Sequence, residues 1–252
     1  MNLTGKIDFN SPLPYYYQLQ EHLQTWMQNQ ALNTHDPLPS EGDLQAHFGV
    51  SRSVVRQALR QLETEGIIYR QKGRGSFVAP PKLRQQISSV TSFTDEMRSR
   101  GIQPGARVLH QAMVPAGEEV ARHLALEASC PVFFLERVRL ADGLPLALES
   151  AYIHFDECAA LAEVDFSSAS LYATLSDKFN LRYLESEQEL EATLASPRES
   201  ELLGLNSGAP VMLARFTTYS DGLHPVEYVK STYRGDKYRF YTIMQRGANR
   251  GI

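Results

Sequence analysis

The feature that most constrains this chain is a run of three segments with helical spacing, followed by a glycine-bounded hairpin pattern. Residues 14–30 carry apolar side chains at helical spacing, which predicts a helix with one buried stripe. Ser40 is placed to cap a second, short helix that ends at Gly49. Ser51 is placed to cap a third helix that ends at Gly66. Two helices joined by a tight turn predict a helix-turn-helix.

The third helix presents a basic outer face. Arg52, Arg56 and Arg60 recur at every fourth position, and Ser53 and Gln57 lie beside them on the same surface. Basic residues outnumber acidic ones from this helix to the end of the hairpin, although the whole chain has a net charge of -4. A local concentration of arginine in an acidic chain indicates a nucleic-acid surface.

A short β-hairpin is expected directly after the basic helix. Residues 67–70 and 75–78 are β-rich, and the turn between them contains Lys72, Gly73 and Arg74. Such a wing can place its two cations against phosphate or the minor groove, while an α-helix fits the major groove, which is about 12 Å wide. A solvated arginine stripe is the simpler interpretation of an isolated helix. The consecutive order of capped helix, turn, basic helix and basic hairpin favours duplex DNA instead.

The pair Pro80-Pro81 marks a domain boundary, because two prolines interrupt both helix and strand. We therefore expect a DNA-binding domain over residues 8–79, a linker over 80–86 and a second domain over 87–247. With 252 residues and 42% hydrophobic residues, the chain is long enough for two such cores.

The second domain contains a weak internal repeat that predicts two helix-plus-hairpin units sharing one antiparallel sheet. The recurring segments are Leu124-Ala125-Leu126, Pro131-Val132 and Asp142-Gly143-Leu144, then Leu203-Gly204-Leu205, Pro210-Val211 and Asp221-Gly222-Leu223. The repeated helices are expected at 117–124 and 197–203. Further helices at 93–100 and 171–179 and a long strand at 183–194 predict an α+β layered architecture.

A pair of arginines distinguishes the two copies of the repeat. Arg137 and Arg139 lie on one face of the predicted strand because side chains alternate, whereas the second copy has Phe216 and Thr218 in their places. Like charges on one face repel, so a bound phosphate or carboxylate is one way to offset them. The alternative left open is an exposed face neutralised by neighbouring carboxylates, namely Glu136, Glu149 or Glu191.

Several other classes of site find no support in the sequence. Cys130 and Cys158 lack metal-ligand spacing, and the seven histidines show no pairing, so neither a metal nor another cofactor is expected. No nucleotide-binding loop or nucleophile motif is present, which argues against an enzyme. No long apolar segment occurs, so we expect a soluble, cytoplasmic protein with no membrane partner.

The N-terminal motifs resemble the GntR family of repressors, which have a winged helix-turn-helix. The resemblance rests on Leu38-Pro39-Ser40-Glu41, Phe48-Gly49-Val50-Ser51-Arg52, Val55-Arg56-Gln57-Ala58-Leu59 and Gly73-Arg74-Gly75-Ser76-Phe77-Val78. It implies that Arg52 and Arg56 contact bases or clamp phosphate and that Gly73 enters the minor groove. Gly42 and Val54 depart from the usual Arg and Thr, so no operator half-site is predicted. The expected DNA contacts are Ser40, Ser51, Arg52, Ser53, Arg56, Gln57, Arg60, Lys72, Gly73 and Arg74.

The second domain resembles the UTRA effector domain of the HutC-type GntR subfamily, through Thr91–Met97, Arg137-Val138-Arg139, Leu148-Glu149-Ser150 and Lys230–Asp236. The resemblance implies a chorismate-lyase-like fold, and it is strongest to members that respond to amino-sugar phosphates. By this similarity the phosphate would meet Ser92, Thr94, Arg137, Arg139 and Ser170, and the sugar hydroxyls and amine would meet Glu149, Glu227, Tyr172 and Tyr233. The full set of expected effector contacts is Ser92, Phe93, Thr94, Arg137, Arg139, Glu149, Ser170, Tyr172, Glu227, Ser231 and Tyr233.

Taken together, the sequence features lead us to expect a homodimeric transcription repressor that binds double-stranded operator DNA and a small anionic effector, either a phosphosugar or a carboxylate. The effector would reposition the two DNA-binding heads through Pro80-Pro81. The identity of the effector, the sign of its action and the regulated genes stay open. An enzyme and an architectural DNA binder without effector are the alternatives, and the large second domain argues against the latter. The tyrosines could equally be core aromatics.

Overall fold

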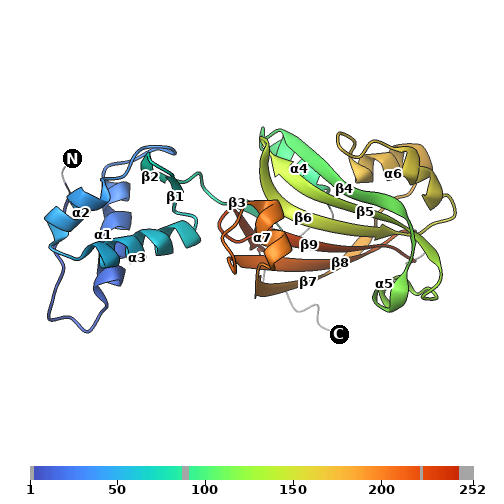
Figure 1. The fold of residues 1–252 in the computed structure, drawn as a ribbon. Helices are drawn as coiled ribbons and strands as arrows, with labels where there is room; N and C mark the ends of the chain where they lie inside the picture. Colours follow the sequence, from blue (N-terminus) through green and yellow to red (C-terminus); the bar gives the residue numbers. More distant parts are fainter. Residues whose placement is uncertain (1–2, 87–90, 222–223, 244–252) are drawn as a thin grey trace, which may run out of the picture. The chain divides into compact units, whose positions relative to one another are not determined.

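The computed structural model describes residues 3–86, 91–221 and 224–243 (Figure 1). Contacts divide the chain into two compact units. The N-terminal unit comprises Met1–Leu83 with Gly235–Lys237, and the C-terminal unit comprises Arg84–Arg234 with Tyr238–Ile252. None of the described helices is long and apolar enough to cross a membrane.

The N-terminal unit is the winged helix-turn-helix expected from the sequence. Its elements are α1 (Tyr15–Asn29), α2 (Glu41–Phe48), α3 (Arg52–Thr64), β1 (Ile68–Gln71) and β2 (Gly75–Val78). The two strands pair in antiparallel register.

Side-chain caps fix the turn between α2 and α3. The Ser40 hydroxyl accepts a hydrogen bond from the backbone N–H of Asp43, whose carboxylate accepts one back from the backbone N–H of Ser40. Gly49 closes α2 at a φ of 66°, a left-handed conformation that glycine adopts without steric cost. Ser51 then caps α3 by accepting from the backbone N–H of Val54. The capping signals in the sequence therefore set the angle at which α3 leaves the turn.

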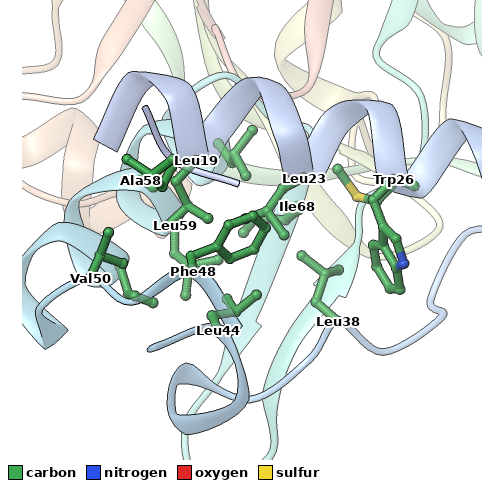
Figure 2. Close-up of a cluster of buried hydrophobic side chains, with 14 residues drawn as sticks. Leu19, Leu23, Trp26, Leu38, Leu44, Phe48, Val50, Ala58, Leu59 and Ile68 are labelled. Carbon is green, nitrogen blue, oxygen red and sulfur yellow. The ribbon is translucent and has the colours of Figure 1, made fainter. Parts of the chain in front are cut away.

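One apolar core holds the three helices and the hairpin together, as Figure 2 shows. Leu19 and Leu23 of α1 are fully buried in the same cluster as Phe48 of α2 and Leu59 of α3, and Ile68 of β1 adds the hairpin. Because the apolar residues of α3 face this cluster, its opposite face is left to polar side chains.

The C-terminal unit is built on a six-stranded antiparallel sheet with the strand order β4-β5-β6-β9-β8-β7. The strands are β4 (Pro104–Pro115), β5 (Pro131–Ala141), β6 (Leu144–Ile153), β7 (Glu185–Leu194), β8 (Pro210–Tyr219) and β9 (Pro225–Arg234). The helices are α4 (Phe93–Ser99), α5 (Gly117–Leu124), the 3-10 helix η1 (Cys158–Glu163), α6 (Leu171–Phe179) and α7 (Pro197–Leu203). A small separate sheet pairs β3 (Leu83–Gln86) with β10 (Tyr238–Tyr241).

Alternation along the strands divides the sheet into two faces with different cores. Phe133 and Leu135 of β5 pack with η1 and α6 on one face. Val132 and Val138 of the same strand belong to clusters on the other face, with α5 and with Leu203 of α7 respectively. Arg137 and Arg139 follow Phe133 and Leu135 in the alternation, so they lie on the face that carries η1 and α6.

The predicted pair of helix-plus-hairpin units is confirmed, as α5 with β5–β6 and α7 with β8–β9. The strands β4 and β10 and the helix η1 were not predicted. Residues 83–86, assigned to the linker, form β3 instead. The second predicted turn, at Gly222-Leu223, lies outside the described residues, as do residues 87–90 and 244–247 of the expected second domain.

Candidate functional site

The outer face of α3 and the hairpin turn form a polar, basic surface on the N-terminal unit. All ten residues expected to contact DNA are exposed: Ser40, Ser51, Arg52, Ser53, Arg56, Gln57, Arg60, Lys72, Gly73 and Arg74. The hydroxyls of Ser40 and Ser51 are already engaged as helix caps. Gly73 has a φ of 76°, and a Cβ there would meet nothing within 4 Å, so backbone conformation explains the glycine.

One carboxylate joins the helix-turn-helix to the wing. Glu41, at the start of α2, accepts from Arg52 Nε at 3.2 Å and from Arg70 Nη2 at 2.7 Å. Arg52 begins α3 and Arg70 lies on β1, so Glu41 holds the basic helix and the hairpin in one arrangement. The Arg52 side chain is 71% exposed and still open to a further anion.

The C-terminal unit contains a cavity of about 350 Å³ on the face of the sheet that carries α6. All eleven residues expected to bind an effector line it: Ser92, Phe93, Thr94, Arg137, Arg139, Glu149, Ser170, Tyr172, Glu227, Ser231 and Tyr233. They come from α4, β5, β6, α6 and β9, so residues far apart in the sequence meet at one place.

The paired arginines are buried in the wall of this cavity, with exposed fractions of 2% for Arg137 and 4% for Arg139. Glu149 lies directly across from Arg137 in the register of β5 and β6, and Arg137 donates to it through both Nε and Nη2. Arg139 Nη1 lies 3.8 Å from the same carboxylate. The alternative of a neutralised face was therefore correct in naming Glu149 as a partner, and wrong in placing the arginines on an exposed surface.

One carboxylate does not satisfy two guanidinium groups. Among the described residues, Arg137 Nη1 and Arg139 Nε are buried and have no hydrogen-bond partner. Burial, followed by the charge of Arg137, lowers the pKa of Arg139 to about 10, so this group stays charged at neutral pH. Despite burial, the charges of Arg137 and Arg139 hold the pKa of Glu149 below its ordinary value. The part of the wall formed by these three side chains therefore carries one excess positive charge and two unused donors.

A second buried carboxyl lies at another part of the wall. Glu227 of β9 is 1% exposed and accepts a hydrogen bond from the Tyr172 hydroxyl at 2.9 Å. Burial is the largest influence on it, and the nearby charge of Glu149 acts in the same direction, so its pKa rises to about 7. Neutral Glu227 donates a hydrogen bond and ionised Glu227 attracts a cation, so it is suited to a ligand with hydroxyl or amine groups.

Two helices begin at the cavity. Ser92 caps α4 and Ser170 caps α6, each by accepting from a backbone N–H of its helix. Within α4, Thr94 Oγ1 accepts from Arg139 Nη2 at 3.2 Å, and the Arg139 guanidinium lies 4.5 Å from the centre of the Phe93 ring. The contacts of α4 thus fix Arg139 in place.

Other residues that line the cavity were not predicted from the sequence, namely Gln85, Thr91, Glu96, Leu171, Leu184, Glu185, Ser186, Gln188, Phe216 and Val229. Ser186 and Gln188 of β7 could have been found, because they alternate on one face of the predicted strand. Phe216 was noted only as the counterpart of Arg137. Nearby, the buried Tyr183 hydroxyl has no hydrogen-bond partner among the described residues.

No group of three or more His, Cys, Asp or Glu side chains in the described ranges could hold a metal ion.

Two family matches account for most of the chain. Residues 15–78 match the bacterial regulatory proteins of the gntR family, and residues 99–239 match the UTRA domain. The first match covers the helices, turn and wing, and the second covers the sheet with most of the cavity.

Curated relatives and solved structures extend over nearly the whole chain. The HTH-type transcriptional repressor NagR of Bacillus subtilis is 41% identical over 95% of this chain and 98% of its own. The histidine utilization repressor of Pseudomonas putida is 32% identical over 90% of this chain and 91% of its own. The crystal structure of PhnF from Mycobacterium smegmatis superposes with a TM-score of 0.64 at 29% identity, covering 91% of this chain and all of that one.

Proposed function

Because the chain belongs to the GntR family of bacterial regulatory proteins and is a transcription repressor rather than an enzyme, we propose that its effector is an amino-sugar phosphate bound in the cavity. Members of this family bind operator DNA, and the UTRA domain binds a small-molecule effector. The chemical class of that effector and the residues that hold it are our proposal.

The observation that carries this proposal is the pair of unpartnered guanidinium donors, Arg137 Nη1 and Arg139 Nε. A buried donor without a partner costs free energy, on the order of 1–3 kcal/mol or more for a charged group. A phosphate dianion would accept from both arginines at once, and its charge would balance the excess cation beside Glu149. Ser92, Thr94 and Ser170 supply hydroxyl groups at the cavity, and the start of α6, which has no acidic residue in its first turn, also favours an anion.

The remaining polar groups suit the sugar. Glu227 and Tyr172 lie in the wall with Tyr233, Ser231 and Glu149 and would bond to the hydroxyl and amine groups. A simple carboxylate would satisfy the arginines but would offer no hydroxyl or amine group to Glu227. A charged amine on the effector would also stabilise the ionised form of Glu227.

For DNA we propose that α3 enters the major groove through Arg52, Ser53, Arg56, Gln57 and Arg60, with Ser40, Ser51, Lys72, Gly73 and Arg74 on the phosphates or in the minor groove. We also propose a homodimer, because one α3 reads only a half-site. We also propose that residues 8–79 bind DNA, that residues 80–86, which include strand β3, connect the two domains, and that residues 87–247 bind the effector.

A thermal-shift panel tests the effector class. Phosphosugars, free sugars and simple carboxylates are added to wild type, Arg137→Met and Arg198→Met. Arg198 is a matched control, because it is an arginine of the same unit that pairs with one glutamate, Glu136, outside the cavity. A ligand at a hundred times its Kd stabilises the folded state by about 2.7 kcal/mol.

We expect glucosamine 6-phosphate to raise the melting temperature of wild type and Arg198→Met but not of Arg137→Met. If only the carboxylates raise the melting temperature, the effector is a carboxylate and not a phosphosugar. The absence of a shift with every anion would refute the proposal.

A further inference from the structure

A buried polar cluster joins the helix at the cavity to the strand that opens the C-terminal unit. Tyr238 of β10 lies at its centre, with its hydroxyl 2.8 Å from Glu96 Oε2 of α4 and 2.7 Å from Gln85 Oε1 of β3. Tyr238 and Glu96 are both buried. Neither belongs to the set of expected effector contacts.

The Tyr238 hydroxyl faces two acceptors with a single hydrogen. In one arrangement it donates to Gln85. In the other it donates to Glu96, and rotation of the Gln85 amide lets that side chain donate to the Tyr238 oxygen instead. Donation to Gln85 leaves Glu96 Oε2 without a hydrogen, whereas donation to Glu96 together with a rotated Gln85 amide satisfies all three groups, so the two states differ in whether α4 or β3 receives the hydrogen.

A second link joins the same two elements. Arg100, just after α4, donates through Nη2 to Glu96 Oε1 at 2.7 Å and to the backbone carbonyl of Arg84 on β3. Arg100 thus holds Glu96 through Oε1, while the Tyr238 hydroxyl reaches Oε2. Movement of α4 therefore changes the bonds made to β3.

The cluster also contacts the cavity directly. Glu96 lines the cavity, and Ser92 and Thr94 on the same short helix are proposed to meet the anion. The Tyr233 ring, in the cavity wall, stacks on Tyr238 with ring centres 4.5 Å apart. On the other side, β3 begins two residues after Pro80-Pro81, the segment that leads from the DNA-binding domain.

We propose that Tyr238 and Arg100 are positioning residues that transmit effector occupancy from α4 to β3, and so to the linker. An anion bound beside α4 makes the Glu96 carboxylate a stronger acceptor, because negative charge nearby increases its affinity for a hydrogen. The Tyr238 hydrogen then moves from Gln85 to Glu96, and β3 changes its hydrogen bonding. This inference rests on the proposed function, because it requires an anionic effector in the cavity.

The test compares Tyr238→Phe with Tyr228→Phe in the full chain. Tyr228 is a matched control, because it is buried in the same unit and its hydroxyl also donates to a glutamate, Glu119, at 3.0 Å, but it does not line the cavity or contact β3. Calorimetry measures the Kd of glucosamine 6-phosphate. Fluorescence anisotropy measures operator Kd with and without this probe, on a duplex selected from a random pool by the wild-type chain.

We expect Tyr238→Phe to bind the probe as wild type does, while the effect of the probe on operator Kd falls by about fivefold, the scale of one lost hydrogen bond. Tyr228→Phe should keep the full effect. If Tyr238→Phe does not fold, Arg100→Met carries the test, because Arg100 is at the surface and makes the other link. If the folded variant binds the probe normally and the probe still changes operator Kd as it does in wild type, the proposed transmission through Tyr238 and Arg100 is overturned and the proposed function stands. If the probe does not bind to wild type, both proposals are overturned.

Discussion

Replacing Glu227 by Gln should remove a pH-dependent loss of stability from the C-terminal unit. The folded-state pKa of Glu227, about 7, lies above its ordinary value of 4.5, so the fold favours the protonated carboxyl. Stability from this group is complete below the ordinary pKa and is lost as pH rises through about 7. Glutamine keeps the shape and can still accept from Tyr172, but it never ionises.

The magnitude follows from the two pKa values. One pKa unit corresponds to about 1.36 kcal/mol, and titration from about pH 5 to about pH 8 spans most of the shift. Between these pH values the free energy of unfolding of wild type should therefore fall by about 2.5 kcal/mol more than that of Glu227→Gln. For a domain of this size, that corresponds to a melting temperature lower by about 5–10 °C. Other titrating groups are common to both proteins and cancel in the difference.

Calorimetry across this pH range measures the effect, and the sole tryptophan provides an internal reference. Trp26 lies in the core of the N-terminal unit, so its fluorescence follows that unit and leaves the other transition to the C-terminal unit. Glu201→Gln, at an exposed position, is the control substitution. Parallel pH curves for wild type and Glu227→Gln would refute the reasoning.

Three further outcomes test the N-terminal unit. Arg56→Ala should weaken operator binding by about 1–3 kcal/mol in anisotropy titrations if it reads a base, whereas the exposed Arg122→Ala should not; equal affinities would remove Arg56 from the interface. Ser40→Ala removes the capping box of α2 and should lower the free energy of unfolding by about 1 kcal/mol in urea titrations; no change relative to the exposed Ser207→Ala would contradict this role. Leu59→Ala, at a position 1% exposed, should cost about 2–5 kcal/mol by Trp26 fluorescence, and a cost near zero would mean that the core is not packed as described.

Local signals were enough to predict the N-terminal unit. Helices α2 and α3 begin at capping serines, and Gly49 ends α2, so their bounds follow from hydrogen bonds within a few residues. The duplicated helix-plus-hairpin units were visible for the same reason, because each copy has its own turn and helix.

Elements fixed by distant partners were not predicted. Strand β3 is short and polar and follows two prolines, and it forms because it pairs with β10 at the far end of the chain. The first-turn acid Glu96 is typical of a solvated helix start, yet it is buried because Tyr238 reaches it.

The cavity was predicted mainly through family resemblance. Alternation placed Arg137 and Arg139 on one face, but burial and the partner depend on how β6 aligns with β5, which brings Glu149 opposite Arg137. That register is a property of the whole sheet. The burial of Glu227 likewise requires α6, which carries Tyr172, to cover this face of the sheet.

Glu41 also determines how the N-terminal unit should respond to ionic strength. Its carboxylate already accompanies the guanidinium groups of Arg52 and Arg70, so these two cations together carry one uncompensated charge toward a polyanion. Each phosphate neutralised by protein releases condensed counterions and steepens the dependence of affinity on salt, by about 0.9 in logarithmic slope. We therefore expect the N-terminal unit to release fewer counterions on binding DNA than its number of arginines suggests, and its affinity for DNA to fall less steeply as the salt concentration rises.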